Sequence, residues 1–330
     1  MPNLNTSYLG LNLKNPVIVA SSGLTDSVSN LVALEQAGAA AVVLKSLFEE
    51  EIVTEMEANL KKMASESFLY PETLEFYEDH EEENSSLKYL SLIREAKSKL
   101  SIPVIASINC VTADHWTFFP KQIEDAGADA LELNIFLLPS DFKRDKTTNE
   151  QIYFDIIEKV TKLIKIPVAI KLSSYFSDLA MTLQKMSQTK IAGLVLFNKY
   201  YNPDFDIHKM VVTSGKVLSS PDDFHNSLRW ISIMSGRVDC DLAASTGIHD
   251  GETAIKLLLA GANALEIASV IYQNGNVQIQ KIIETIQSWM NAKGFEKMDE
   301  FRGKMSQSDS KNPAAYERVQ FMKYFRGYQK

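Results

Sequence analysis

The sequence predicts an α/β protein with a (β/α)8 TIM barrel. Short apolar runs alternate with helical patterns along the chain, and there are eight of each. The runs are apolar throughout, which is typical of strands buried on both faces in a parallel sheet. Eight strands that alternate with eight helices predict a closed parallel barrel. An open doubly wound sheet is the alternative, and the unbroken eightfold alternation disfavours it.

The apolar runs are of two kinds that interleave in order. Runs of the first kind follow a proline or a similar boundary, and they span residues 15–22, 102–109, 166–173 and 240–247. Runs of the second kind follow an Ala-Gly pair, and they span residues 37–46, 126–134, 192–198 and 260–269. The glycine of each pair fits the position after a helix end, where a left-handed residue stops the helix before the next strand.

Helical patterns fill the intervals between these runs. Apolar residues recur there at spacings of three and four, as on the buried face of a helix. The predicted helices cover residues 27–37, 86–100, 116–126, 151–164, 177–186, 227–236, 250–260 and 278–292.

Three segments lie outside the repeat. Residues 4–14 contain two short alternating runs around Gly10 and predict an N-terminal β-hairpin that closes the barrel bottom. Residues 47–85 are an insertion after strand two, with an acidic stretch at 78–83. We therefore expect one barrel domain over residues 1–293, followed by a tail over 294–330 that packs on the barrel or forms a subunit contact.

Composition excludes several classes of protein. The net charge of −8 argues against a nucleic-acid binder, which needs a basic surface. No apolar run approaches the length of a membrane span, and the first residues show no signal pattern. Two cysteines without a CxxC pair suit a reducing cytosol, and the five histidines show no metal-binding spacing. We expect a cytoplasmic protein with no membrane, nucleic-acid or metal partner.

Active sites of such barrels lie at the carboxyl ends of the strands, and here every strand ends in a hydrogen-bonding group. These groups belong to Ser21, Ser22, Lys45, Ser46, Asn109, Asn134, Lys171, Ser173, Asn198, Lys199, Ser245, Thr246 and Ser269. Lys45 and Lys171 each follow an apolar run, which predicts an ammonium near the barrel axis that needs an anion or another acceptor. Two such lysines with amides between them suit a polar, planar ligand.

The ends of the last two strands carry a further signal. Thr246 and Gly247 precede a predicted helix, and Ala268 and Ser269 follow strand eight. Such a corner is common in barrels that bind a phosphate, because glycine permits close backbone approach and helix N-termini offer N–H groups. No GxGxxG follows a strand, so the sequence does not support a dinucleotide-binding Rossmann site.

Six short motifs resemble motifs of the dihydroorotate dehydrogenase family, and they occur in the same order and at similar spacings along the chain. They lie at residues 13–21, 43–46, 128–134, 169–172, 246–248 and 259–269. The resemblance extends from about residue 4 to residue 276. The chain resembles the soluble class 1 enzymes, as a divergent member, and is also similar to the flavin barrel of dihydropyrimidine dehydrogenase.

The resemblance implies FMN as the cofactor. It implies that the flavin and its polar edge contact Ala20, Ser21, Gly23, Lys45, Ser46 and Lys171, and that Asn109, Asn134 and Asn198 serve the flavin or a ring substrate beside it. It implies that Thr246, Gly247, Ala268 and Ser269 hold the ribityl phosphate. In the family a hydride passes from the substrate ring to flavin N5, while a base removes a neighbouring proton.

The loop after strand four departs from the family pattern. The family places a Ser-Cys-Pro-Asn loop there, whose cysteine or serine is the base. Leu137 fills that position here and cannot accept a proton. Ser140 and Asp141 can replace the base only if the loop is remodelled. We carry Lys45 and Ser140 as candidate catalytic residues.

The substrate half of the site also departs from the family. The asparagine segment that the family places after strand two is not recognisable in residues 47–85. Strand six continues into Phe197-Asn198-Lys199-Tyr200, which differs from the family as well. The FMN half of the site thus looks retained and the dihydroorotate half altered.

Three functional hypotheses follow. The first is a flavin-dependent dehydrogenase of pyrimidine biosynthesis, acting on the CH–CH bond of dihydroorotate or a related small ring compound, with a soluble electron acceptor. The second is a flavin-binding barrel that has lost dihydroorotate oxidation and acts on another substrate or as a binding or regulatory protein. The third is a barrel without flavin that acts on a sugar phosphate. Family members are often dimers, so a homodimer is also expected.

Overall fold

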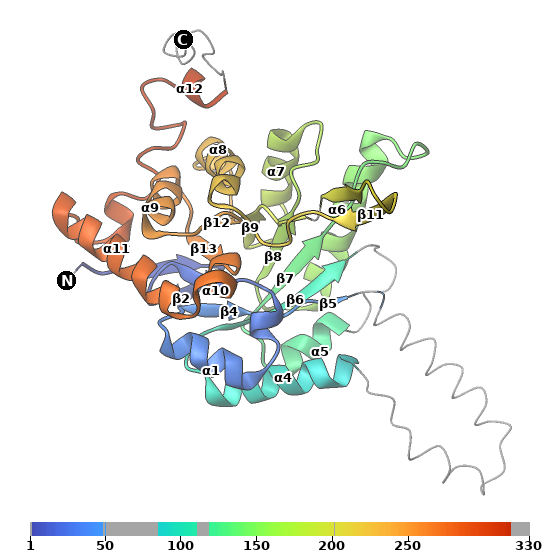
Figure 1. The fold of residues 1–330 in the computed structure, drawn as a ribbon, viewed down its shortest axis with the longest axis horizontal. Coiled ribbons are helices and arrows are strands. Elements are labelled where there is room, and N and C mark those ends of the chain that lie inside the picture. The colour runs from blue at the N-terminus through green and yellow to red at the C-terminus, as the bar shows by residue number, and fades with distance from the viewer. Residues whose placement is uncertain (1, 49, 51–84, 111–118, 201, 318–330) are drawn as a thin grey trace, which may run out of the picture.

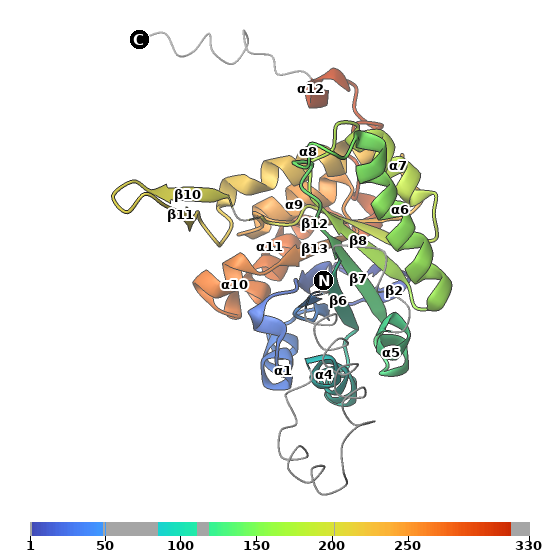
Figure 2. The same ribbon diagram turned by 90° about the vertical axis from the view of Figure 1, so that its right-hand side faces the viewer.

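A closed parallel barrel forms the centre of the molecule (Figures 1 and 2). The computed structural model describes residues 2–48, 50, 85–110, 119–200 and 202–317. Its main sheet has the strand order β4-β3-β13-β12-β9-β8-β7-β6-β5, and an additional pairing of β4 with β6 closes the ring. The predicted (β/α)8 barrel is therefore confirmed, and the open doubly wound sheet is excluded.

The barrel strands fall within the eight predicted apolar runs, and all neighbours pair in parallel. They are β3 (Val17–Val19), β4 (Ala41–Val43), β6 (Val104–Cys110), β7 (Ala130–Ile135), β8 (Val168–Leu172), β9 (Gly193–Leu196), β12 (Asp241–Ser245) and β13 (Ala264–Ile267). The short β5 (Leu47–Phe48) continues strand two upward along β6.

Helices surround the barrel at the predicted places. They are α1 (Val28–Gln36), α4 (Ser85–Lys99), α5 (Phe119–Asp125), α6 (Lys146–Leu163), α7 (Leu179–Ser187), α8 (Phe224–Met234), α9 (Gly251–Ala260) and α11 (Val277–Lys293). Helix α6 begins five residues earlier than predicted. Its cap explains the difference, because the Asp145 carboxylate accepts a hydrogen bond from the Thr148 N–H at 2.7 Å.

Several short elements were not predicted. A hairpin of β10 (Pro203–Asp206) and β11 (Val211–Ser214) extends from the barrel after β9 (Figure 2). Both strands are almost wholly exposed. The sequence therefore lacks the alternation of apolar and polar residues by which a half-buried strand is predicted. The others are η1 (Gly23–Thr25), η3 (Pro221–Asp223), α10 (Ser269–Asn274), η4 (Met298–Glu300) and α12 (Ala314–Glu317).

Two expected segments lie partly outside the described residues. Most of the 47–85 insertion is among them, as are residues 318–330 of the tail. Within the described tail, the Gly303 N–H donates to the Leu258 carbonyl and the Gln307 N–H to the Ser232 carbonyl, which ties this segment to α9 and α8. No described helix has the length and apolar character needed to cross a membrane.

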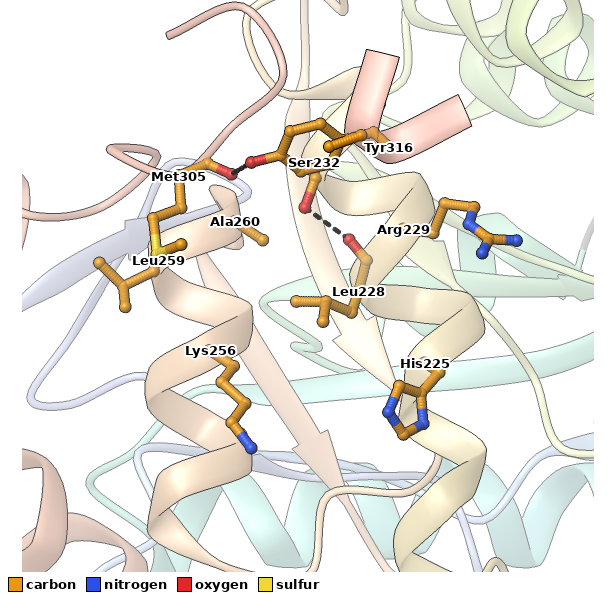
Figure 3. A pocket seen from close by; sticks show the side chains of 10 residues that line it. His225, Leu228, Arg229, Ser232, Lys256, Leu259, Ala260, Met305 and Tyr316 are labelled. Atoms are coloured by element: carbon orange, nitrogen blue, oxygen red, sulfur yellow. Dashed lines mark hydrogen bonds between the residues drawn. The ribbon is translucent and has the colours of Figure 1, made fainter. Parts of the chain in front are cut away.

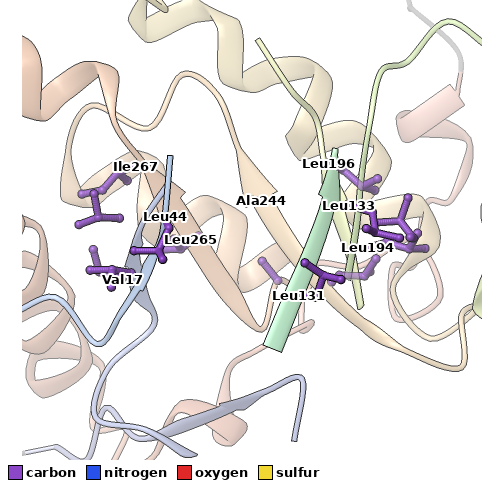
Figure 4. Close-up of a cluster of buried hydrophobic side chains, with 14 of the residues drawn as sticks. Val17, Leu44, Leu131, Leu133, Leu194, Leu196, Ala244, Leu265 and Ile267 are labelled. Atoms are coloured by element: carbon purple, nitrogen blue, oxygen red, sulfur yellow. The ribbon is translucent and has the colours of Figure 1, made fainter. Parts of the chain in front are cut away.

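Alternate side chains of each barrel strand point to opposite faces, so the strands supply two cores. Outward residues such as Leu131, Leu133 and Leu194 pack beneath the helices (Figure 4). Inward positions near the bottom of the barrel hold small residues, among them Ala130 and Ala169. The small inward residues leave room for a plug from outside the barrel.

The N-terminal hairpin supplies that plug, as the sequence predicted. Strands β1 (Thr6–Tyr8) and β2 (Leu11–Leu13) pair in antiparallel fashion. Tyr8, Leu9 and Leu13 are buried in the inner core. Gly193 makes room for them, because a Cβ there would lie 2.5 Å from Leu9 Cδ2. The Leu9 N–H also donates to the Asp241 carboxylate at 2.8 Å, which fixes the hairpin to β12.

We expect Leu9→Ala to lower the free energy of unfolding by about 2–4 kcal/mol, because it leaves a cavity where the plug fills the barrel. Urea unfolding followed by circular dichroism measures the change. Leu11→Ala on the same hairpin is the control, since Leu11 is only half-buried, and it should cost less than half as much. Equal losses in the two variants would contradict the role of Leu9 as a plug.

Candidate functional site

A cavity of about 80 Å³ opens at the carboxyl ends of the barrel strands. Eight of the residues predicted for the cofactor line it: Ala20, Ser21, Lys171, Asn198, Thr246, Gly247, Ala268 and Ser269. Lys199, Ser219, Ser245, Ile248, Glu266 and Ile267 complete the lining. The volume is below the ~300 Å³ of a typical small-molecule site. The cavity by itself therefore has room only for a small ligand or for one end of a larger one.

Three further predicted residues stand beside this cavity. Ser46 bonds to Ser21 through its hydroxyl at 3.0 Å and to the Ser107 hydroxyl at 2.7 Å, so it belongs to a chain of serines across strands one to three. Asn134 accepts a hydrogen bond from the Asn198 amide at 2.8 Å. Asn109 is half-buried and pairs in register with Asn134 on the neighbouring strand.

Gly23 lies in η1 and approaches α10. A Cβ at Gly23 would stand 2.9 Å from the Tyr272 hydroxyl, so a larger residue there would displace the end of that side chain.

Lys45 departs from its expectation. The sequence predicted a desolvated ammonium near the barrel axis, but the Lys45 side chain is exposed. Strand β4 ends two residues earlier at Val43, so Lys45 stands above the last barrel layer, where the mouth is open. The expected burial was wrong for Lys45, and Lys45 is not among the residues that line the cavity.

Lys171 is buried as expected, and two carboxylates hold it. Its ammonium lies 2.7 Å from Glu266 Oε2 and 3.3 Å from Glu132 Oε1, and all three residues are at most 4% exposed. Burial lowers the pKa of Lys171, but the attraction of Glu132 and Glu266 outweighs it, and the net pKa is raised. Lys171 therefore stays charged.

Two carboxylates with one ammonium leave an excess negative charge inside the barrel. Isolated buried charge is costly, so the cluster is expected to retain a proton. Burial first, and then the neighbouring Glu266, raise the pKa of Glu132 well above its usual range. One oxygen of Glu266 is buried without a hydrogen-bond partner among the described residues. The raised pKa favours the protonated form of Glu132.

The cluster was not predicted, although the sequence carries a signal for it. Glu132 and Glu266 each stand within an apolar run, in the matching segments Ala-Leu-Glu-Leu and Ala-Leu-Glu-Ile. An acid in a strand buried on both faces requires a partner, and Lys171 in another such strand is the natural one.

The predicted phosphate corner is a tight turn. Thr246 and Gly247 both have positive φ, at 74° and 79°, and the Thr246 hydroxyl donates to the Phe197 carbonyl at 2.8 Å. A Cβ on Gly247 would lie 2.2 Å from the backbone nitrogen of Phe224, so the turn packs directly against the start of α8. Only glycine combines this φ with this contact.

Ser219 joins the parts of the corner and was not predicted from the sequence. Its hydroxyl accepts from the Gly247 N–H at 3.2 Å and bonds to His249 Nε2 at 3.1 Å, while its N–H donates to the Ser269 hydroxyl at 3.0 Å. The helix-start pattern of Ser220-Pro221 after strand six could have drawn attention to this loop. The following helix α9 is capped by its own Asp250, which accepts from the Thr253 N–H at 2.7 Å.

The loop after β7 places the candidate base residues. Leu137 is buried, and its N–H donates to the Tyr153 hydroxyl at 3.3 Å. Ser140 is exposed and is not among the residues that line the cavity. Phe136 stacks on Tyr200 with ring centroids 4.0 Å apart, just beyond the Asn134–Asn198 bond. An aromatic pair, which the sequence pattern did not predict, thus follows strands β7 and β9 at their carboxyl ends.

Comparison with known proteins agrees with this geometry. The family model described as dihydroorotate dehydrogenase matches residues 75–290. The chain is 25% identical to the dihydroorotate dehydrogenase B (NAD(+)) catalytic subunit of Thermoplasma volcanium, over 92% of the chain and 98% of the relative. It is 24% identical to the corresponding subunit of Methanocaldococcus jannaschii, over 87% and 93%. It is also 24% identical to a putative dihydroorotate dehydrogenase A (fumarate) of Aeropyrum pernix, over 92% and 97%.

The corner at Gly247 is tested by Gly247→Ala against Gly294→Ala. Both glycines have a similar positive φ, but Gly294 ends α11 in the left-handed region and a Cβ there meets nothing within 4 Å. We expect Gly294→Ala to lower the free energy of unfolding only by the backbone strain of about 1 kcal/mol. Gly247→Ala should cost at least about 2 kcal/mol more, because the methyl group displaces the start of α8. Thermal unfolding measures both, and equal losses would contradict the close packing at Gly247.

The raised pKa of Glu132 predicts that Glu132→Gln changes the free energy of unfolding by an amount that depends on pH. The folded state binds a proton at Glu132 more tightly than the unfolded state, so this contribution to stability is full below the ordinary carboxyl pKa and is lost as pH rises through the raised pKa. Glutamine keeps a neutral hydrogen-bonding group at every pH. The free energy of unfolding of the variant should therefore increase relative to that of the wild type as pH rises from about 5 to 8.

Urea unfolding at several pH values in this interval provides the measurement. Glu158→Gln is the control, since Glu158 is exposed on α6 and its pKa is lowered by Lys162. That variant should show no such gain. If the wild type instead became more stable relative to Glu132→Gln as pH rises, folding would lower the pKa of Glu132 and the assignment would be contradicted.

Proposed function

Because the chain belongs to the dihydroorotate dehydrogenase family, we propose that it is an FMN-dependent oxidoreductase that moves a hydride from dihydroorotate or a related small ring compound to flavin N5. The observation that carries the proposal is the cavity at the barrel mouth, which gathers eight residues expected to contact the flavin. The family supports oxidoreductase chemistry. The cofactor and the substrate are parts of the proposal.

The groups at the mouth fit FMN. Hydroxyls of Ser219, Ser245, Thr246 and Ser269 line the cavity beside the tight turn at Gly247, and such groups suit a phosphate and a ribityl chain. We assign the phosphate to Thr246, Gly247, Ala268 and Ser269, and the flavin edge to Ala20, Ser21, Gly23, Lys45, Ser46, Lys171 and the three asparagines, Asn109, Asn134 and Asn198. When bound, FMN supplies the acceptor for the hydride.

The chain's own residues orient the reactants. Glu132 and Glu266 hold the Lys171 ammonium in one place, so it can serve as a fixed positive charge beside the flavin edge. The hydrogen bond between Asn134 and Asn198 fixes the two amides relative to one another. Phe136 and Tyr200 form a flat wall against which a ring can lie.

The proton-removal step is where this chain departs from the family. Leu137 is apolar and buried at the position expected for the base, and Ser140 is exposed. Ser140 remains the proposed substitute, which requires a movement of the loop. The same observation favours a second candidate function: a flavin barrel that acts on another substrate or as a binding or regulatory protein.

Further parts of the proposal concern partners. The names of two relatives include NAD(+) and a catalytic subunit. We propose that this chain passes its electrons to a soluble acceptor and acts in pyrimidine biosynthesis. We also propose that it forms a homodimer and is located in the cytoplasm.

Anaerobic mixing of the FMN-loaded protein with dihydroorotate, followed by visible absorbance, tests the function. We expect slow bleaching of the flavin in the wild type, and bleaching at least about a hundredfold faster in Leu137→Cys, because a thiol there restores a base. Leu137→Ala is the control for the space that is opened. Dithionite provides the fully reduced reference.

The possible outcomes separate the hypotheses. No bleaching in the wild type or in Leu137→Cys, with flavin bound and reducible by dithionite, would exclude dihydroorotate and leave the second function. A purified protein that does not retain FMN and does not bind it when added would overturn the flavin proposal itself.

A further inference from the structure

A second cavity lies outside the barrel, in the cleft between α8 and α9 (Figure 3). Its volume is about 280 Å³, larger than that of the cavity at the mouth and close to the ~300 Å³ at which small-molecule sites begin. The proposed flavin site does not use this cleft. Of the family motifs, only the one at residues 259–269 contributes to its lining, through Leu259 and Ala260.

The walls of the cleft are mainly apolar. Leu228 lines it from α8 and Leu259 from α9, and Met305 of the C-terminal segment lies above Leu259 (Figure 3). The Tyr316 hydroxyl donates to the Met305 carbonyl at 2.7 Å, so the C-terminal segment is tied over this end of the cleft. The Ser232 hydroxyl donates to the Leu228 carbonyl and is therefore already used.

The rim of the cleft is cationic. Lys256 and His225 approach it from opposite helices at the end away from Tyr316 (Figure 3). Arg229 also lines it from α8, but its guanidinium points away from α9 in this view. Within the described part of the chain, neither Arg229 nor Lys256 has a carboxylate partner; the Lys256 ammonium lies 5.5 Å from the centre of the Phe224 ring. Unpaired cations around one apolar cleft are notable in a chain of net charge −8.

We propose that the cleft binds a small amphipathic anion. Its apolar body would lie on Leu228, Leu259 and Met305, and its carboxylate would meet the Lys256 ammonium at the rim. The chain's own last residues, 318–330, are a poor occupant, because they carry four basic residues and no acidic one. Like charge on the rim would oppose them. The proposal does not depend on the flavin site.

Isothermal titration with decanoate tests the proposal, because decanoate combines an apolar chain with one carboxylate. We expect saturable binding of one molecule per chain, and no comparable binding of decylammonium, which has the same chain with the opposite charge. Lys256→Gln should weaken decanoate binding roughly three- to tenfold, which is the effect of losing one partly solvated ion pair.

Two further variants locate the ligand. Met305 is 58% exposed, so Met305→Glu should fold normally while its carboxylate repels the ligand and weakens binding more than tenfold. Lys281→Gln is the matched charge control, since Lys281 is exposed on α11, away from the cleft, and it should leave binding unchanged. Circular dichroism confirms that the variants are folded.

The proposal is overturned if decanoate shows no saturable binding to the wild type. It is also overturned if decylammonium binds as tightly as decanoate, since the cationic rim would then have no role. Equal decanoate affinity in the wild type, Lys256→Gln and Met305→Glu would mean that decanoate binds elsewhere.

Discussion

Closure of the parallel sheet is the constraint on which the rest of this structure depends. Once β4 pairs with β6 and β3 with β13, every strand is covered on both faces, and its inward side chains must fill a space of fixed width. Small residues near the bottom meet this condition only because the hairpin inserts Tyr8 and Leu9 from below. Polar inward residues can then occur only toward the mouth, where they find partners or a ligand.

The cluster of Glu132, Lys171 and Glu266 lies at the transition between these two regions. It sits above the small apolar residues of the barrel bottom, and Lys171 and Glu266 also line the cavity at the mouth. A buried ion cluster of this kind adds little to stability, because desolvation offsets the attraction between its charges. Its value is positional: three strands each contribute one charged group, and together they fix an ammonium at the floor of the site.

The two ends of helix α8 connect this site with the outer surface. Its first residue packs against the turn at Gly247, and its later residues form one wall of the cleft toward α9. The turn at Gly247 and the outer cleft are thus built on the same rigid element. Loops that follow the strands bring further groups to the mouth, such as the stacked rings of Phe136 and Tyr200.

The sequence by itself determined the barrel, the hairpin beneath it and the polar groups at the mouth. Apolar runs and glycine boundaries are local patterns. The element that contains Gly127 or Ile170 can therefore be predicted from neighbouring residues alone. Tertiary structure alone decided which groups meet: Ser219 with Gly247, Glu266 with Lys171, and Phe136 with Tyr200. It also decided that Lys45 is exposed while Lys171 is buried, although both follow apolar runs. Such contacts join residues far apart in the chain, and their geometry follows from barrel closure and strand register rather than from any local pattern.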